Sequence, residues 1–188
     1  KIIIMPNHVT NKLTVRKHGA IKVLPALYSG TIEYNSIDEK LYDILRNFSF
    51  KKILSEPKAT IDFGKSANLT EWRWDNWGTR TDAYVVDDPA DEWQNKDETI
   101  NLINSFGQFE TAWSPPLKVV RKLQKMFPDY SFALDYIDEQ FMFCGTMDVK
   151  GEDNYTEEEK DLRYYGAYLL DYSHRELDEF FESCEETA

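Results

Sequence analysis

The stretch SFALDYIDEQFMFCGTMDV (131–149) alternates apolar and polar side chains in two runs. Alternation with a period of two is typical of strands that bury one face. The runs SFALDY (131–136) and QFMFCGTMDV (140–149) are separated only by IDE. This stretch therefore predicts a hairpin-like pair of strands.

A helix and a further strand are expected before this pair. Ser114 and Pro115 supply an N-cap and a first-turn proline, and Pro128 ends the helix. The buried side of this helix is expected to comprise Leu117, Val120, Leu123 and Phe127. TINLINSFGQFETAW (99–113) is mostly strand-like, and Gly107 near its middle indicates a bulge or a close backbone approach.

The N-terminal part supplies the remaining elements. HVTNKLTV (8–15) predicts the first strand. Ser36 and Glu39 have the spacing of a capping box, and the apolar stripe that follows predicts a helix to about residue 47. FSFKKIL (48–54) is expected to be a short strand, and AYVV (83–86) is strand-like.

This order of elements is that of the ferredoxin-like α+β sandwich, in which helices cover one face of an antiparallel sheet. Residues 1–150 are expected to form this domain, with loop insertions, and residues 151–188 an acidic helical extension packed on it. Two further capping boxes, Thr156/Glu159 and Ser173/Glu176, predict helices in the extension. The apolar stripe of the last helix comprises Leu177, Phe180, Phe181 and Cys184.

Composition excludes several classes of protein. Hydrophobic residues make up 41% and aromatic residues 14% of the 188 residues, which favours a compact globule over a disordered chain. No apolar run approaches the roughly 18–20 residues that cross a bilayer, and the opening KIII is too short for the core of a signal peptide. The expected location is therefore the cytoplasm, with no membrane partner.

The net charge of −12 is concentrated at the C-terminal end. Residues 138–188 contain 16 acidic and 4 basic side chains, so the totals of 34 and 22 leave 18 of each sign in residues 1–137. An acidic surface repels nucleic acid and attracts basic proteins, whereas the simpler alternative is a solvated helical face. The predicted acidic face of the last helix comprises Asp178, Glu179, Glu182, Glu185 and Glu186.

Five segments resemble, in order, the motifs of the YubB-type ferredoxin-like proteins of bacteriophages, plasmids and other mobile elements. They are MPNHVTNKLTV (5–15), FSFKKILSEPK (48–58), NWGTRTDA (76–83), FETAWSPP (109–116) and FPDYSFALDYIDEQFMFCG (127–145). The resemblance spans about residues 5–150 and leaves the acidic tail outside. It implies a ferredoxin-like fold and an accessory role in a mobile element, and it implies no reaction.

Catalytic and metal-binding groups are not assembled in recognisable motifs. His8, His18 and His174 do not stand at metal-ligand spacing from one another or from a cysteine. Cys144 lies in an alternating strand, as a core residue would, and its pairing with Cys184 is left open. There is no P-loop and no GxGxxG motif, so no cofactor is expected.

Acidic residues cluster around one loop and could hold Mg²⁺ if several of them converged. They are Asp82, Asp87, Asp88, Asp91 and Glu92. Such clusters are usually solvated, so no metal site is assigned.

WRWDNWGTRTDAY (72–84) contains three tryptophans and an Arg/Asp pair. Trp74 and Trp77 have opposite parity, so one strand face cannot bury both, and a turn is expected near residues 75–76. Gly78 suits a positive φ or a tight approach. Arg80 and Asp82 would then share a strand face, where an ion pair can form.

Two interpretations of this stretch stay open. As architecture, Trp77 and Trp113 plug the end of the sheet, and each indole N–H needs a partner. As an interface, the combination of Trp and Arg is typical of a binding hot spot. The candidate binding residues are then Trp74, Trp77, Arg80, Asp82 and Trp113.

A basic stripe is expected on the second helix, opposite its apolar side. It consists of Lys118, Arg121, Lys122 and Lys125, at i, i+3, i+4 and i+7. The stripe is either a solvated face, a phosphate-binding surface, or a partner of the acidic tail in the same chain or a neighbouring copy.

These observations favour a non-enzymatic interaction protein of a phage or mobile element. It would act through its acidic surface on a basic host protein, as an inhibitor of a nucleic-acid-handling defence system of the anti-CRISPR or anti-restriction type. The alternative is a single-stranded nucleic-acid or nucleotide binding module that uses helix 117–127 and the Trp-rich loop. A second alternative is a metal-dependent hydrolase at loop 82–92.

Overall fold

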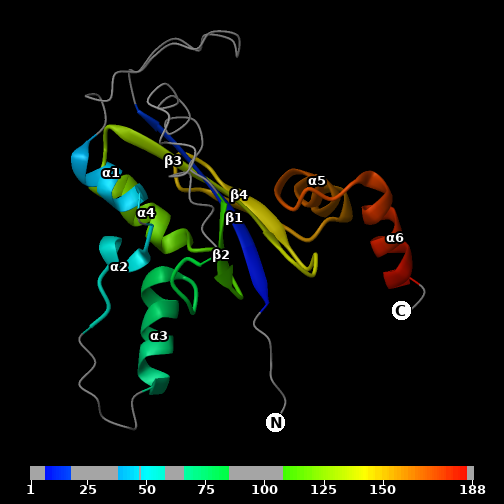
Figure 1. The fold of residues 1–188 in the computed structure, drawn as a ribbon, viewed down its shortest axis with the longest axis horizontal. Helices are drawn as coiled ribbons and strands as arrows, with labels where there is room; N and C mark the ends of the chain where they lie inside the picture. The colour runs from blue at the N-terminus through cyan, green and yellow to red at the C-terminus, as the bar shows by residue number, and fades with distance from the viewer. Residues whose placement is uncertain (1–6, 18–37, 47, 58–65, 85–107, 186–188) are drawn as a thin grey trace.

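The computed structural model describes residues 7–17, 38–46, 48–57, 66–84 and 108–185. Within them the strands form one antiparallel five-stranded sheet in the order β2-β1-β3-β4-β5 (Figure 1). The strands are β1 (His8–Lys17), β2 (Gln108–Ala112), β3 (Tyr130–Asp138), β4 (Cys144–Met147) and β5 (Asp153–Thr156). The predicted hairpin within 131–149 is confirmed as β3 and β4.

The sheet contains the split β-α-β unit of a ferredoxin-like fold. β2 and β3 both pair antiparallel with β1, so they are parallel to each other, and α4 (Leu117–Met126) connects them. Tyr84 forms an isolated bridge with Glu110 on the outer edge of β2, where a further strand is expected. The predicted ferredoxin-like α+β class is therefore confirmed, while residues 85–107, including Gly107 and most of the predicted strand at 99–113, lie outside the described residues.

One face of the sheet packs against α1 (Glu39–Arg46), α2 (Phe50–Ile53) and α4, with α3 (Ser66–Trp77) beside α4 (Figure 1). Every second strand residue points into this core because side chains alternate along a strand. The strand residues buried here include Val9, Leu13, Val15, Phe132 and Leu134. Helix α4 contributes Val119, Val120 and Leu123.

Residues 48–54 form a helical turn, so the predicted strand there is wrong. Phe50 and Ile53, at i and i+3, both enter the core. Asp82 holds the start of α2: Phe50 N donates to Oδ1 at 2.6 Å and Ser49 Oγ to Oδ2 at 2.7 Å. A four-residue helix is too short to show helical periodicity, and its cap lies some thirty residues away (Ser49 to Asp82).

Two predicted helix starts need correction. Asp38 Oδ1 accepts a hydrogen bond from Leu41 N at 3.0 Å and caps α1, whereas Ser36 lies outside the described residues. Helix α4 begins at Leu117, with Pro116 as its N-cap residue. Ser114 does not cap it because its Oγ donates to Gly78 O at 2.6 Å.

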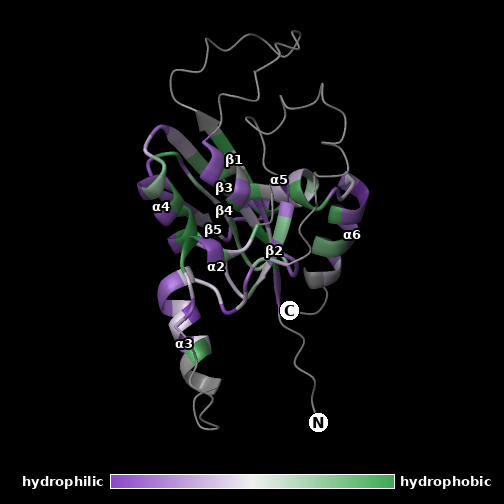
Figure 2. Cartoon of the chain, turned by 60° about the vertical axis from the view of Figure 1, so that its left-hand side comes forward, coloured by the Kyte–Doolittle hydropathy of each residue, from purple (hydrophilic) through white to green (hydrophobic). Residues whose placement is uncertain are grey.

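Helices α5 (Glu159–Leu169) and α6 (His174–Glu185) of the C-terminal extension pack on the face of the sheet opposite to α1, α2 and α4. Ile137 and Cys144, paired across β3 and β4, point toward these helices. The two C-terminal helices thus dock through their apolar side, whereas residues 153–156 of the predicted helical extension form β5 at the edge of the sheet. Figure 2 shows hydrophobic and hydrophilic residues alternating around α6, as in an amphipathic helix.

The turn between β3 and β4 positions a phenylalanine against α5 and α6. Buried Asp138 shapes the turn by accepting hydrogen bonds from Gln140 N and Met142 N. Burial raises the pKa of the Asp138 carboxyl above its usual range. The turn projects Phe141 among the helices, where its ring centroid lies 4.8 Å from that of Phe180 and 5.6 Å from that of Phe181.

Of the two capping boxes predicted in the C-terminal extension, one forms. Glu176 Oε2 accepts from Ser173 N at 2.9 Å, and Glu176 N donates to Ser173 Oγ at 3.3 Å. The Thr156/Glu159 box is wrong because Thr156 ends β5, paired with Cys144, and α5 begins only at Glu159. The described residues contain no helix that is long and apolar enough to cross a membrane.

Replacing Asp82 by alanine should lower the free energy of unfolding by about 2 kcal/mol, because buried donors at the start of α2 lose a charged acceptor. Urea denaturation measures the change. Asp75→Ala, which removes an exposed carboxylate, is the control and should be close to neutral. Equal effects of the two variants would contradict the capping role of Asp82.

Gly166→Ala should weaken the docking of α5 and α6. An added Cβ would lie 2.5 Å from Phe141 Cε1 and 3.0 Å from Leu177 Cδ2. Overpacking typically costs about 1–3 kcal/mol, which exceeds the roughly 1 kcal/mol that alanine gains in helix propensity.

Alkylation of the buried Cys144 in a Cys184→Ser background reports this docking, and we expect faster labelling in the Gly166→Ala variant. Lys160→Ala, an exposed change in the same helix, should leave the rate unaltered. A slower rate in Gly166→Ala would show that the helix tolerates the extra methyl group.

Candidate functional site

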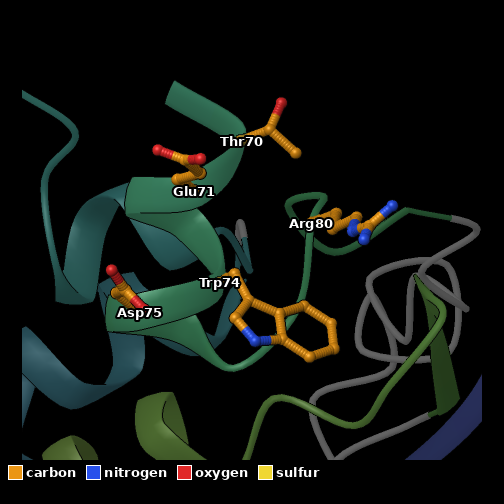
Figure 3. A pocket seen from close by; sticks show the side chains of 5 residues that line it. All are labelled: Thr70, Glu71, Trp74, Asp75 and Arg80. Atoms are coloured by element: carbon orange, nitrogen blue, oxygen red, sulfur yellow. The ribbon is translucent and has the colours of Figure 1, made fainter. Parts of the chain in front are cut away.

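The Trp-rich stretch is the end of α3, not a strand followed by a turn near residues 75–76. The helix ends at Trp77, and Gly78 follows with φ +82°, in agreement with the positive φ expected there. Helical geometry separates Trp74 and Trp77 into different environments. Figure 3 shows Trp74 with Thr70, Glu71 and Asp75 along α3, and Arg80 on the segment beyond.

Trp77 lies fully buried in the core and cannot contact a ligand at the surface. Its indole Nε1 donates to Leu54 O at 3.0 Å, which supplies the partner that a buried indole needs. Phe50 and Trp72 pack edge-on against it, with ring centroids 5.6 Å and 5.7 Å away. Trp77 is therefore a structural residue, in agreement with the architectural interpretation.

Asp82 also serves the fold rather than a surface site. Both carboxylate oxygens accept hydrogen bonds from Ser49 and Phe50 at the start of α2, and Ala83 N adds a third. The ion pair that was possible between Asp82 and Arg80 is not formed. Arg80 points elsewhere, toward two indoles.

Trp74, Arg80 and Trp113 come together at the surface. Trp74 and Trp113 keep 44% and 39% of their area exposed. The guanidinium of Arg80 lies 5.6 Å from the ring centroid of Trp74 and 5.8 Å from that of Trp113. Such cation–π contacts stabilise exposed sites by about 0.5–1 kcal/mol each. Trp113 adopts φ +73°, and its N–H donates to Asn7 O at 2.8 Å.

A groove of about 360 Å³ adjoins these residues, between the end of α3, the start of α4 and the β4–β5 pair. We call it the aromatic groove. The side chains that define it are Trp74, Trp113, Lys118, Arg121, Tyr136, Phe143, Asp153 and Tyr155. A second hollow of about 620 Å³, shown in Figure 3, is lined by Thr70, Glu71, Trp74, Asp75 and Arg80. Trp74 lines both.

Half of the predicted basic stripe lines the aromatic groove. Lys118 Nζ donates to the carbonyls of Trp74 and Asp75, at 3.2 Å and 2.9 Å, where the end of α3 leaves carbonyls unsatisfied. Arg121 Nε donates to Gly151 O at 3.2 Å and ties α4 to the loop between β4 and β5. Lys122 and Lys125 lie exposed further along α4.

The acidic tail does not pair with this stripe within the described part of the chain. α5 and α6 pack on the opposite face of the sheet from α4. On the predicted acidic face, Asp178 pairs with Arg163 at 2.7 Å, Glu179 with Arg175 at 3.5 Å, and Glu182 is exposed. The side chain of Glu185 and all of Glu186 lie outside the described residues. Pairing with a neighbouring copy stays a prediction.

Sequence patterns do not predict the floor of the groove. Tyr136 lies across β4, and its Oη donates to Asp153 Oδ1 at 2.7 Å. Tyr155 stacks on Phe143 with a centroid distance of 5.6 Å and remains 54% exposed. The sequence does not identify these residues as part of a site. Strand β5 is short and polar, and Tyr136 and Phe143 fit the pattern of core residues in a hairpin.

The chemistry of a nucleophile or a metal centre receives no support from the described residues. Burial raises the pKa of the Cys144 thiol to about 12, which keeps it protonated at neutral pH. No group of three or more potential ligands stands together in the part of the chain that the structure describes. Asp87, Asp88, Asp91 and Glu92 of the acidic loop lie outside that part.

Comparison with known proteins supports the fold. Residues 91–181 match the model of a family described as "Ferredoxin-like domain in Api92-like protein". The match continues through β5 and α5 into α6, so most of the tail lies inside the family pattern, not outside it as expected from the resemblance. No curated protein and no solved structure matches the chain significantly. Just under half of the chain is therefore similar to a ferredoxin-like family, in agreement with the topology of the sheet.

Proposed function

We propose that the protein binds single-stranded nucleic acid or nucleotides in the aromatic groove. One observation carries this proposal: the Trp-rich stretch and the basic helix, far apart in sequence, contribute to the same groove. Trp74 comes from the first of these and is joined there by Trp113, while Lys118 and Arg121 come from the second. The proposed site thus combines ring faces with fixed positive charge.

The two kinds of side chain match the two parts of a nucleotide. Stacking of a base on an aromatic side chain is worth about 1–3 kcal/mol, and Lys and Arg neutralise phosphates. A volume of about 360 Å³ falls within the usual range for small-ligand sites. Unpaired bases are favoured because a base in a duplex cannot offer its face to Trp113 or Tyr155.

The groove is also the better choice between two faces of the sheet. Ferredoxin-like RNA-binding sheets stack bases on aromatic side chains of the open face. Here the strand residues on the face away from α4, within the described part, include no Phe, Tyr or Trp; β1 presents His8, Thr10, Lys12 and Thr14. Exposed tyrosines on the other face, such as Tyr168 beside Lys12, belong to α5 and not to the strands, whereas Tyr155 of the groove is itself a strand residue.

The acidic tail opposes the approach of nucleic acid but does not occupy the groove. Its helices lie on the other face of the sheet, whereas residues 1–137 are balanced in charge. At physiological salt the Debye length is about 8 Å, so charges beyond the sheet are largely screened.

Tryptophan fluorescence tests the proposal. Short unpaired oligonucleotides should quench the emission. Trp113→Phe or Trp74→Phe should reduce the quenching and weaken the affinity by less than the roughly 1–3 kcal/mol that complete removal of the ring would cost. Trp72→Phe, a partly buried neighbour of Trp77, is the matched control. Absence of quenching by oligonucleotides and by nucleotides would refute the proposal.

The exposed lysines give a second readout of the same proposal. Removing one lysine that neutralises a phosphate should reduce the slope of log affinity against log salt by about 0.7 for a single strand. Lys122→Ala and Lys125→Ala are expected to do so if the strand continues along α4. Lys52→Ala, which removes an ammonium that pairs with Asp43, should leave the slope unchanged.

We propose as a second function that the acidic face of α6 binds a basic protein, as expected of an inhibitor of a nucleic-acid-handling defence system. The supporting observation is the segregation of the acidic excess into residues 138–188. A stoichiometric partner captured from host lysate by the wild type should not bind the Glu179→Lys/Glu182→Lys variant. Retention of that partner by the double variant would contradict a role of this face.

A further inference from the structure

The floor of the aromatic groove presents a carboxylate oxygen in a fixed position. Tyr136 Oη donates to Asp153 Oδ1 at 2.7 Å, while Asp153 Oδ2 has no hydrogen-bond partner among the described residues. Burial, together with the hydrogen bond to Asp153, raises the pKa of the Tyr136 phenol, so it stays a donor at neutral pH. Asp153 lines the groove and is exposed, so its second oxygen is available to accept a hydrogen bond from a ligand.

The sheet itself sets the position of this carboxylate. An added Cβ at Gly145 would lie 2.5 Å from Tyr136 Oη and 2.7 Å from Asn154 O. Only glycine at this position of β4 lets the tyrosine ring from β3 cross to β5. The arrangement thus spans three paired strands and does not depend on a loop.

A stacking platform lies beside the carboxylate. Asp153 and Tyr155 are two residues apart on β5 and share a face of the sheet, at a spacing of about 7 Å. The Tyr155 ring is held by Phe143, and its Oη donates to Glu157 Oε1 at 2.6 Å. A base stacked on Tyr155 would bring its edge toward Asp153.

We infer that the groove prefers bases that carry an exocyclic amino group at this edge, cytosine over uracil. The N4 amino group of cytosine would donate to Asp153 Oδ2, whereas the O4 carbonyl of uracil would face a carboxylate and be repelled. Arg121 and Lys118, on the wall formed by α4, are placed to meet the phosphates. This inference rests on the proposed function, since it names the base that the same site selects.

The experiment compares binding of short oligo-dC and oligo-dU at neutral pH, followed by tryptophan quenching. The wild type should bind oligo-dC about tenfold more tightly. In Asp153→Asn, the amide oxygen can still accept from Tyr136, and the amide nitrogen then donates toward the base. The preference should disappear or reverse in favour of oligo-dU.

Two further variants test whether the preference for cytosine depends on the position of Asp153 and not on the local negative charge. A third measurement tests whether each variant is folded. Glu152→Gln removes a neighbouring exposed charge outside the groove and should keep the preference for oligo-dC. Tyr136→Phe keeps the ring but releases Asp153, and it should reduce the preference several-fold. Unfolding midpoints show that each variant is folded under the assay conditions.

The outcomes are distinguishable. Equal affinity of the wild type for oligo-dC and oligo-dU, or a cytosine preference that survives Asp153→Asn, would overturn the inference while binding itself stands. Failure of both oligonucleotides to bind would overturn the proposed function and the inference with it.

Discussion

The antiparallel pairing of β1 with β3 is the constraint on which the other elements depend. It runs from Val9 opposite Asp138 to Lys17 opposite Tyr130. Because side chains alternate, this register sends Leu13, Val15, Phe132 and Leu134 to one face. A slip of one residue would move this whole set to the other face, where α5 now packs beside Ile137.

The groove forms because the sheet extends further than the helix that covers this part of its face. α4 packs on β3, while β4 and β5 extend the sheet beyond that cover. Asp153 and Tyr155 lie on this extension, and Tyr136 of β3 reaches across it on the same face as α4. Arg121 then fixes the opposite wall by its hydrogen bond to Gly151 of the β4–β5 loop.

Much of the fold could be predicted from alternation and from helical stripes. β1, the β3–β4 pair and α4 have strong patterns, and their order is that of a ferredoxin-like sandwich. α2 could not be predicted because it has four residues and takes its capping acceptor from Asp82, far along the chain. The parity of Trp74 and Trp77 predicts a turn only if the stretch is a strand, whereas a helix separates the two side chains equally well.

The candidate site was only partly predictable, for a related reason. Trp74, Arg80, Trp113 and two members of the basic stripe were identified by residue type, which needs no knowledge of the fold. Trp77 is also a tryptophan, but its side chain is buried in the core and is not part of the groove. Asp153 and Tyr155 belong to β5, a polar strand without alternation that is recognisable only beside β4. A local sequence pattern does not show which elements, distant in the sequence, lie side by side in the fold.

The placement of α5 and α6 gives the molecule a permanent electrical polarity. Among the described residues, the acidic side chains of α5 and α6 lie on one side of the sheet, and the three lysines and one arginine of α4 lie on the other. A polyanion near such a particle exerts a torque as well as a force. If the proposed function holds, this torque would turn the acidic helices away from the polymer and bring α4 to face it before contact. Within about 8 Å of the surface, the Debye length at physiological salt, carboxylates that are screened from the groove would still orient the collision.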